Sequence, residues 1–488
     1  MKKNSITKNI TLLMAAIVMA SCGDFLEEES QSEVIPKTVQ DLRELLLGSA
    51  YPDGDTRMCG FLYLMDDDVE MSYDINPTLA DNTMIVNYFS AFTWQPNLFE
   101  DVNTLDGLSG GNNAYSHFYG RIKGCNAVLD QLEEATGDAM LIARTRAEAL
   151  TLRSWYYLQL VNLFATPYNV DKSAPGVPLQ LTAEVNEQGI ARSTVEQVYN
   201  QMIADLNEAV GLFAKAGITV TQDYRVNQAV AQLLLSRIYL YMEDWDRCIS
   251  ASNAAIALGN GLEDMTGYST NMPAASYSFK ESVWVYGYAE YTLYACPNNL
   301  NCHPSQELMS LFDKENDKRY TAWTRSMTNY DFSTGMFLII TGEIINKNDY
   351  YSTSARLGNS LRIVEAYLNR AEAYARKGDG RKAAEDLNYI CGNRIVGYQN
   401  VPMASLDDIL TERRKELCFE THRWFDLRRC GMPAITHRWK AGSTAETLTY
   451  TLQQGDPMYV LPLPATVMEH NSDLVQNPSA TATMRTGM

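Results

Sequence analysis

Apolar residues recur at the spacing of an α-helix over much of the chain, and polar capping residues mark the points where these patterns begin. Thr38, for example, stands three residues before Asp41, which is the arrangement of a capping box at a helix start. The patterns predict helices at residues 38–47, 112–134, 138–164 and 194–213. The fold is therefore predicted to be mainly α.

Two later helix pairs, at residues 227–258 and 361–393, share one spacing of small and aromatic residues. A small, an aromatic and a second small residue lie at positions 0, 3 and 12, as Ser236, Tyr239 and Cys248 and again as Ala371, Tyr374 and Ala383. This spacing is typical of tetratricopeptide helix pairs, which stack into a rigid curved wall. Plain antiparallel helices are the alternative interpretation.

Residues 405–431 are predicted to form one helix. Ser405 stands three residues before Asp408, which predicts the start, and Gly431 followed by Pro433 predicts the end. Large apolar residues, an arginine and an acid fall at offsets 0, 4, 7, 11 and 14 on a single face, namely Arg413, Leu417, Glu420, Trp424 and Leu427.

Glu420 shares this predicted face with large apolar side chains. A carboxylate in such surroundings is costly unless a cation pairs with it. Arg413, Arg423 and Arg428 are within helical or tertiary reach. The pattern therefore predicts a partly buried Arg–Glu network that locks the helix onto its neighbours. A catalytic Glu420 is the alternative.

Two regions, at residues 57–103 and 259–359, lack helical periodicity and predict loops with short strands. Trp284 lies in a strand-like run and is predicted to belong to the core. The acids Asp66, Asp67 and Asp68 lack the glycine and spacing of an EF-hand loop, so a solvated cluster is favoured over a calcium site. The G-x-S-x-G letters at 107–111 predict a loop, because no buried strand precedes them.

The chain begins with Lys2, Lys3 and Lys8 and an apolar run at residues 10–20, which is too short to span a bilayer. This pattern predicts a secretory signal over residues 1–21. The signal ends in Met19-Ala20-Ser21-Cys22, which is similar to a lipobox, so we expect acyl chains on Cys22 and an acidic tether over residues 22–35. A signal whose cysteine is incidental is the alternative.

The net charge of −19 becomes −22 when the three lysines of the signal are removed, because that segment holds no acids. Phosphate contacts need Lys and Arg, so this charge argues against nucleic acid as a partner. Aromatic residues make up 10% of the chain, with 29 Tyr and 7 Trp. Such rings fit the apolar face of a sugar.

The reactive residue types form no recognisable constellation. The five His do not pair at the spacing of a metal site or a catalytic triad, and no C-x-x-C pair occurs among the nine Cys. Catalytic residues, a metal and a cofactor are therefore not expected. Cys296 and Cys302 flank a loop and either form a disulfide or remain thiols.

The stretch from Glu412 to Gly431 resembles the C-terminal signature of the SusD/RagB family, E-R-R-x-E-L-x-x-E-x-x-R-W-x-D-L-x-R-x-G. Thr421 and His422 stand where a glycine often occurs. The matching residues are Glu412, Arg413, Arg414, Glu416, Leu417, Glu420, Arg423, Trp424, Asp426, Leu427, Arg428 or Arg429, and Gly431.

This resemblance implies a SusD-like fold, mainly α, with tetratricopeptide-type helix pairs and an irregular, loop-rich ligand-binding region with short strands. It further implies a single domain over residues 36–488. Its expected parts are an N-terminal half (36–220), tetratricopeptide-like units (221–260 and 360–395), a loop-rich region (261–359) and the signature region (396–488).

Family members are lipid-anchored nutrient-binding proteins of the Bacteroidetes outer membrane, paired with a SusC-like TonB-dependent transporter. The resemblance therefore implies a non-catalytic protein on the cell surface that binds glycan and delivers it to such a transporter. RagB-like capture of peptides is the first alternative. A surface glycan-degrading enzyme is a second, and a purely structural scaffold is a third.

Family ligands lie on loops of the N-terminal third and of the middle of the chain. Aromatic rings there could act as plates for sugars, with polar side chains beside them; the alternative is that each ring packs in the core. The candidate plates are Tyr73, Trp94, Tyr288, Tyr291 and Trp323, and the candidate polar partners are Arg57, Asp74 and Asn97.

Overall fold

The computed structural model describes residues 36–52, 60–71, 89–100, 113–184, 189–221, 223–270, 272–288, 302–331, 338–345, 347, 357–441 and 445–488. Helices dominate these residues, and the strands form four separate two-stranded antiparallel ribbons. The prediction of a mainly α fold is confirmed.

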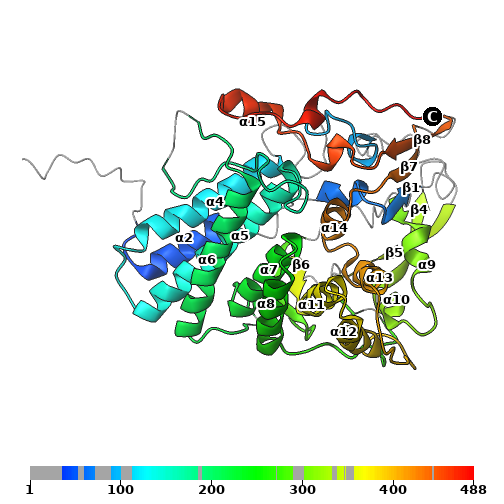
Figure 1. The fold of residues 1–488 in the computed structure, drawn as a ribbon, viewed down its shortest axis with the longest axis horizontal. Helices are drawn as coiled ribbons and strands as arrows, with labels where there is room; N and C mark the ends of the chain where they lie inside the picture. The colour runs from blue at the N-terminus through cyan, green and yellow to red at the C-terminus, as the bar shows by residue number, and fades with distance from the viewer. Residues whose placement is uncertain are drawn as a thin grey trace, which may run out of the picture.

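The N-terminal half is a helical bundle, drawn in blue to teal in Figure 1. Its helices are α2 (Val39–Ser49), α4 (Ala114–Gln131), α5 (Ala139–Phe164) and α6 (Val195–Lys215). The predicted capping box is present, since Thr38 Oγ1 accepts from Asp41 N and Asp41 in turn accepts from Thr38 N. Helix α5 packs against α2, α4 and α6 and is buried on nearly all sides along its second half.

The two predicted helix pairs are present and lie next to each other (Figure 1). They are α7 (Gln228–Tyr241) with α8 (Trp245–Leu258), and α11 (Val364–Arg376) with α12 (Gly380–Gly392). The predicted small residues lie where helices touch. Ser236 Oγ is 2.7 Å from Ser252 Oγ and accepts from Asn369 Nδ2 at 2.9 Å.

The ribbons join segments that are far apart in the sequence. The pairs are β1 (Val69–Met71) with β3 (Cys302–Pro304), β2 (Ser282–Tyr288) with β6 (Leu357–Arg362), β4 (Thr324–Asp331) with β5 (Leu338–Ile345), and β7 (Ile435–Lys440) with β8 (Thr447–Leu452). Three short helices are also present, α9 (Gln306–Ser310), α10 (Lys318–Trp323) and α15 (Ala465–His470).

The prediction of one continuous helix over residues 405–431 is wrong. The chain forms α13 (Leu406–Leu417) and α14 (Arg423–Arg429), with the predicted capping box at Ser405 intact. Between them Phe419 and Thr421 have φ of 56° and 60°, which is left-handed backbone that no right-handed helix contains. The turn directs the carboxylate of Glu420 to Arg362 and Lys347, and this pairing is available only when the helix breaks.

The main hydrophobic core runs through both halves and includes Trp284, which is fully buried as predicted. A second apolar cluster lies under the loop-rich region and contains Leu308, Met309, Trp323 and Ile345. Among the described helices, none combines the length and the apolar character needed to cross a bilayer.

Candidate functional site

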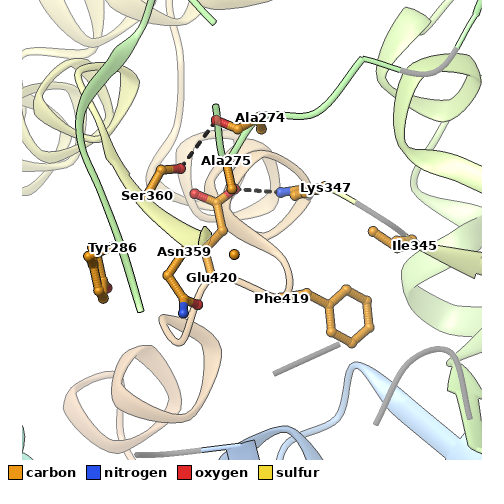
Figure 2. A pocket seen from close by; sticks show the side chains of 10 residues that line it. Ala274, Ala275, Tyr286, Ile345, Lys347, Asn359, Ser360, Phe419 and Glu420 are labelled. Atoms are coloured by element: carbon orange, nitrogen blue, oxygen red, sulfur yellow. Dashed lines mark hydrogen bonds and ion pairs between the residues drawn. The ribbon is translucent and has the colours of Figure 1, made fainter. Parts of the chain in front are cut away.

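The β2–β6 ribbon contributes two residues to a pocket in the loop-rich region. Tyr288, the last residue of β2, pairs with Leu357, the first residue of β6. Two residues further into the ribbon, Tyr286 pairs with Asn359, and both residues line the pocket (Figure 2).

This narrow pocket, which we call the Tyr286 pocket, has apolar and polar walls. Figure 2 shows Tyr286 and Ile345 on opposite sides, with Asn359, Phe419 and Glu420 between them. The complete lining is Ala274, Ala275, Tyr286, Ile345, Lys347, Gly358, Asn359, Ser360, Phe419 and Glu420.

The ring of Tyr286 is held by an aromatic ladder that begins in the core. It stacks on Trp284 with centroids 4.2 Å apart and planes at 23°. Trp155 from α5 meets Trp284 and Tyr286 edge-on, at 5.3 and 5.0 Å. Trp284 is fully buried whereas Tyr286 is half-buried, so the ladder presents a rigid, pre-positioned ring at the pocket.

The residue just beyond this ring is a glycine in left-handed backbone. Gly287 has φ of 62°, a conformation that glycine adopts without the clash a Cβ would cause. A larger residue at this position would strain the end of the ribbon that lines the pocket.

The floor of the pocket is formed by Glu420 and the two cations that pair with it, Lys347 and Arg362. Lys347 Nζ donates to Glu420 Oε1 at 2.7 Å (Figure 2). It also donates to the Glu416 carbonyl at 2.8 Å. Arg362 donates to the same Glu420 carboxylate, with Nη2 to Oε1 at 2.7 Å. Burial would raise the pKa of Glu420, but the charges of Arg362 and Lys347 outweigh burial and hold it below its usual value.

Glu420 belongs to a larger buried Arg–Glu network centred on Glu416, as predicted, but the predicted partners of Glu420 are wrong. Arg413 binds Asp426, Arg423 binds Asp67, and Arg428 donates to backbone carbonyls, because the break between α13 and α14 turns Glu420 away from them. Glu416 accepts from Arg319 at 2.8 Å, from Arg362 at 2.7 Å and from Arg394 at 3.1 Å. Glu281 binds Arg394 at 2.6 Å and Arg362 at 3.1 Å. A general acid needs a pKa near the working pH, whereas the charges of the surrounding cations hold the pKa values of Glu416 and Glu420 below their usual range. The arrangement favours a structural role for Glu420 over a catalytic one.

Trp94 does not present a ring to ligand, contrary to the prediction. It is fully buried, its Nε1 donates to the Met65 carbonyl at 2.8 Å, and its ring stacks on His437 with centroids 4.3 Å apart. The same residue has φ of 52°, so the local backbone turns the indole into the core. Its role is packing.

Trp323 is also a core residue rather than a plate. It is 1% exposed and lies beneath the floor of the Tyr286 pocket. Lys347 Nζ is 4.1 Å from its ring centroid and Arg362 Cζ is 5.5 Å from it. The ring thus stabilises two cations of the ion network by cation–π contact.

Of the remaining predicted site residues, the structure describes only Asn97 and Tyr288. Asn97 is half-buried, with a buried Oδ1 that has no hydrogen-bond partner. Tyr288 is described by its backbone, as the last residue of β2 next to the pocket. Arg57, Tyr73, Asp74 and Tyr291 lie outside the described residues, so they stay predictions.

The triplet at 66–68 is not a solvated cluster, contrary to the prediction. Asp66 and Asp68 are buried. Arg423 binds both carboxylate oxygens of Asp67 at 2.6 Å, and Arg414 Nε donates to Asp68 Oδ1 at 2.7 Å. The compensating arginines come from the signature region. Arg414 lies 346 residues after Asp68 and Arg423 lies 356 residues after Asp67, so no local pattern predicts these pairs.

Within the described part of the chain, no three His, Cys, Asp or Glu side chains are grouped so as to hold a metal ion. Cys22, Cys296 and the 107–111 motif lie outside the described residues, and Cys302 is described by its backbone only. The described thiols are free, namely Cys125, Cys248, Cys391, Cys418 and Cys430.

The pocket contains residues that the sequence did not single out. Tyr286 carried a usable signal, because Trp284 and Tyr286 alternate on one face of a strand that leaves the core. Asn359 and Phe419 carried no such signal in the sequence. They reach the pocket only because β6 pairs with β2 and because the chain turns between α13 and α14.

The sequence matches two related families. Residues 24–240 match a family described as starch-binding and associating with the outer membrane, and residues 277–479 match the SusD family. No curated protein matches the sequence.

The fold is similar to several solved structures. A SusD-like carbohydrate-binding protein from Bacteroides vulgatus has a TM-score of 0.67 at 21% identity, covering 90% of this chain and 97% of that one. A SusD superfamily protein from Bacteroides thetaiotaomicron has a TM-score of 0.67 at 23% identity, covering 90% and 100%. A laminarin-binding SusD-like protein has a TM-score of 0.62 at 19% identity, covering 91% and 99%. At these identities the likeness establishes a common fold.

Proposed function

The chain belongs to the SusD/RagB family, and from this premise we propose that it binds glycans at the cell surface and passes them, chemically unchanged, to a SusC-like TonB-dependent transporter. The carbohydrate-binding and laminarin-binding proteins of the same fold support the ligand class. The paired and ionised state of Glu416 and Glu420 supports binding without catalysis at these carboxylates.

The observation that carries the proposal is the aromatic ladder ending at Tyr286. A sugar has an apolar C–H face and a polar edge, so it needs a flat ring with hydrogen-bonding groups beside it. Tyr286 provides the ring, and Asn359 and Ser360 provide amide and hydroxyl groups in the same pocket. The ladder holds the ring in place before a ligand arrives, which reduces the entropy lost on binding.

Such a site binds weakly. Burying about 80 Å² of sugar face at about 25 cal/mol per Å² contributes about 2 kcal/mol for each stacked ring. Two or three stacked rings contribute about 4–6 kcal/mol, which corresponds to millimolar to high-micromolar affinity. Weak binding suits a protein that captures a nutrient and then releases it to a transporter.

We further propose that the mature protein is attached to the outer membrane, facing outward, by acyl chains on Cys22. The family description as associating with the outer membrane supports this attachment. Each buried CH₂ of an acyl chain contributes about 0.8 kcal/mol, so several chains hold a protein on a membrane. Replacing Cys22 with Ala should shift the protein from the membrane fraction to the soluble fraction of the native cell.

The proposal is tested by titrating the mature protein with a panel of polysaccharides that includes laminarin and starch. We expect at least one neutral glycan to bind, and Tyr286→Ala to weaken that binding by about thirtyfold, because one stacked ring is lost. Tyr389→Ala is the matched control, since Tyr389 is a 42% exposed tyrosine on α12 that does not line the pocket.

Two further measurements test the alternative functions, peptide capture and glycan degradation. Binding of a peptide mixture, with no binding of any glycan, would replace the ligand class by that of RagB-like peptide capture. New reducing ends released from a bound oligosaccharide during long incubation would show an enzyme. Absence of binding to both ligand classes would leave a scaffold protein and overturn the proposal.

A further inference from the structure

A second hollow lies outside the Tyr286 pocket and shares none of its lining residues. We call it the Glu343 cleft. Its free space is about 810 Å³ including its open mouth. Its lining comes from β3, α9, the turn after α9 and β5, as His303, Pro304, Gln306, Met309, Ser310, Lys314 and Glu343.

The cleft and the Tyr286 pocket share one strand and one apolar base. Ile345 lines the pocket and Glu343 lines the cleft, and these residues are two positions apart on β5. Two positions along a strand place side chains on the same face about 7 Å apart. Ile345 and Met309 belong to one buried cluster, against which Phe419 also packs. The two hollows therefore adjoin along β5.

Lys314 and Glu343 form a charge-balanced pair at the cleft, beside the polar lining residues His303, Gln306 and Ser310. Lys314 Nζ is 3.5 Å from Glu343 Oε2, and both side chains are about half exposed. The hydroxyl of Tyr320 donates to the other Glu343 oxygen, and Lys314 Nζ lies 4.9 Å from the centroid of the Tyr320 ring. The carboxylate is thus oriented by a side chain that itself packs on the apolar cluster.

This set has the chemistry to bind a neutral sugar. A pair of neighbouring hydroxyls offers both a donor and an acceptor, which match a carboxylate and an ammonium respectively. The cleft presents Lys314 together with Glu343, so the attraction of a uronic-acid or sulfated chain to Lys314 is opposed by repulsion from Glu343. Met309 and Pro304 are buried and provide an apolar base.

We infer that the Glu343 cleft is a second subsite and that the ligand is a neutral oligosaccharide whose linked rings occupy both hollows along β5. This inference rests on the proposed function and specifies its ligand. A single sugar can fill only one hollow at a time. Affinity should therefore rise with chain length until both are occupied.

The test measures affinity by calorimetry for glucose oligosaccharides of one to six units, cut from laminarin and from starch; if another neutral polysaccharide of the panel binds instead, its own oligosaccharides are used. We expect affinity to rise by about tenfold or more from the shortest to the longest ligands and then to level off. Glu343→Gln should remove about tenfold from the affinity for the long ligands only, because one charge-assisted hydrogen bond is lost.

Two further variants serve as a replicate and a control for this comparison. Lys314→Ala should weaken long ligands in the same way, which shows that the effect does not depend on one substitution. Glu315→Gln makes the same chemical change as Glu343→Gln at an exposed neighbour of Lys314 that lines neither hollow, and it should bind like the wild type.

The outcomes are distinct. Affinity that is independent of chain length, or unchanged in Glu343→Gln, overturns the second subsite while Tyr286-dependent glycan binding still supports the proposed function. Preference for uronic-acid oligosaccharides overturns the neutral ligand class. If no glycan of the panel binds, the proposed function fails and the second subsite fails with it.

Discussion

His437 lies between the rings of Phe92 and Trp94, and its two nitrogens face backbone carbonyls. Nδ1 is 2.7 Å from the Phe92 oxygen and Nε2 is 2.9 Å from the Asp66 oxygen. The carbonyls favour a charged ring and burial disfavours it. Burial prevails and lowers the pKa of His437 to about 4, so the ring is neutral at pH 7.

This burial predicts a loss of stability in mild acid. An unfolded histidine has a pKa of about 6.5. Between pH 6.5 and 4 the unfolded state therefore binds more protons than the folded state, and the free energy of unfolding falls as the pH falls. The expected loss from His437 is about 3 kcal/mol. Denaturant unfolding of His437→Gln across this range should show a shallower pH dependence than the wild type; equal slopes would contradict the assignment.

Glu416 provides a second residue-scale prediction. Three arginines converge on its carboxylate, and their charges hold its pKa well below the usual value despite burial. Glu416→Gln keeps the shape of the side chain but leaves the arginines with surplus buried charge. We expect a loss of about 3–5 kcal/mol in the free energy of unfolding. Exposed Glu385→Gln, on the surface of α12, should change it by less than about 0.5 kcal/mol.

At the scale of elements, the turn between α13 and α14 determines where the side chains of Phe419 and Glu420 lie. Phe419 and Thr421 both adopt left-handed backbone, and Thr421 is a β-branched residue for which this conformation is strained. The strain persists because the turn allows Glu420 to reach Arg362 and Lys347, and the neighbouring Phe419 to line the Tyr286 pocket.

This strain makes Thr421→Gly an expected stabilising change. Glycine adopts left-handed backbone without the penalty of about 1–2 kcal/mol that other residues meet. Part of that gain is offset by the larger entropy of glycine in the unfolded chain, so we expect a net gain of about 0.5–1 kcal/mol in denaturant unfolding. Thr421→Ala keeps a Cβ and should not show the gain. A destabilised Thr421→Gly would mean that Thr421 makes contacts that outweigh its strain.

At the scale of the molecule, the C-terminal region wraps the end of α5. The guanidinium of Arg428 donates to the carbonyls of Asn162, Ala165 and Tyr459. Leu461 N donates to the Leu163 carbonyl at 2.9 Å, and the main hydrophobic core extends through both halves of the chain. The parts matched by two separate family descriptions are thus joined through a shared interior.

We therefore propose that residues 36–488 form one domain and expect them to unfold in a single transition. Far-UV circular dichroism and tryptophan fluorescence should give coincident denaturation curves. Arg428→Met should lower the free energy of unfolding by about 3 kcal/mol or more, because three buried carbonyls lose their donor. Two resolved transitions in the wild type would instead show that the halves fold independently.

The sequence alone determined most of the helical framework. Helix starts at Thr38, Asn113, Asp138 and Thr194 follow from capping side chains, and the helix pairs follow from repeated small and aromatic positions. These signals are local, since a cap and a helical face involve residues within a few positions of one another. That Glu420 needs a cation was also predictable, because a carboxylate among large apolar residues is costly unless paired. Its actual partners, Arg362 and Lys347, were not predictable, because they come from outside the signature region.

Only the tertiary structure decided which rings face a ligand and which acids are paired. Trp94 and Tyr286 are both aromatic residues in irregular regions, yet the first is enclosed and the second borders a pocket. Asp67 is paired by an arginine 356 residues away. Burial and pairing depend on segments that meet only after folding, whereas the spacing of residues along the chain reports on neighbours within a few turns.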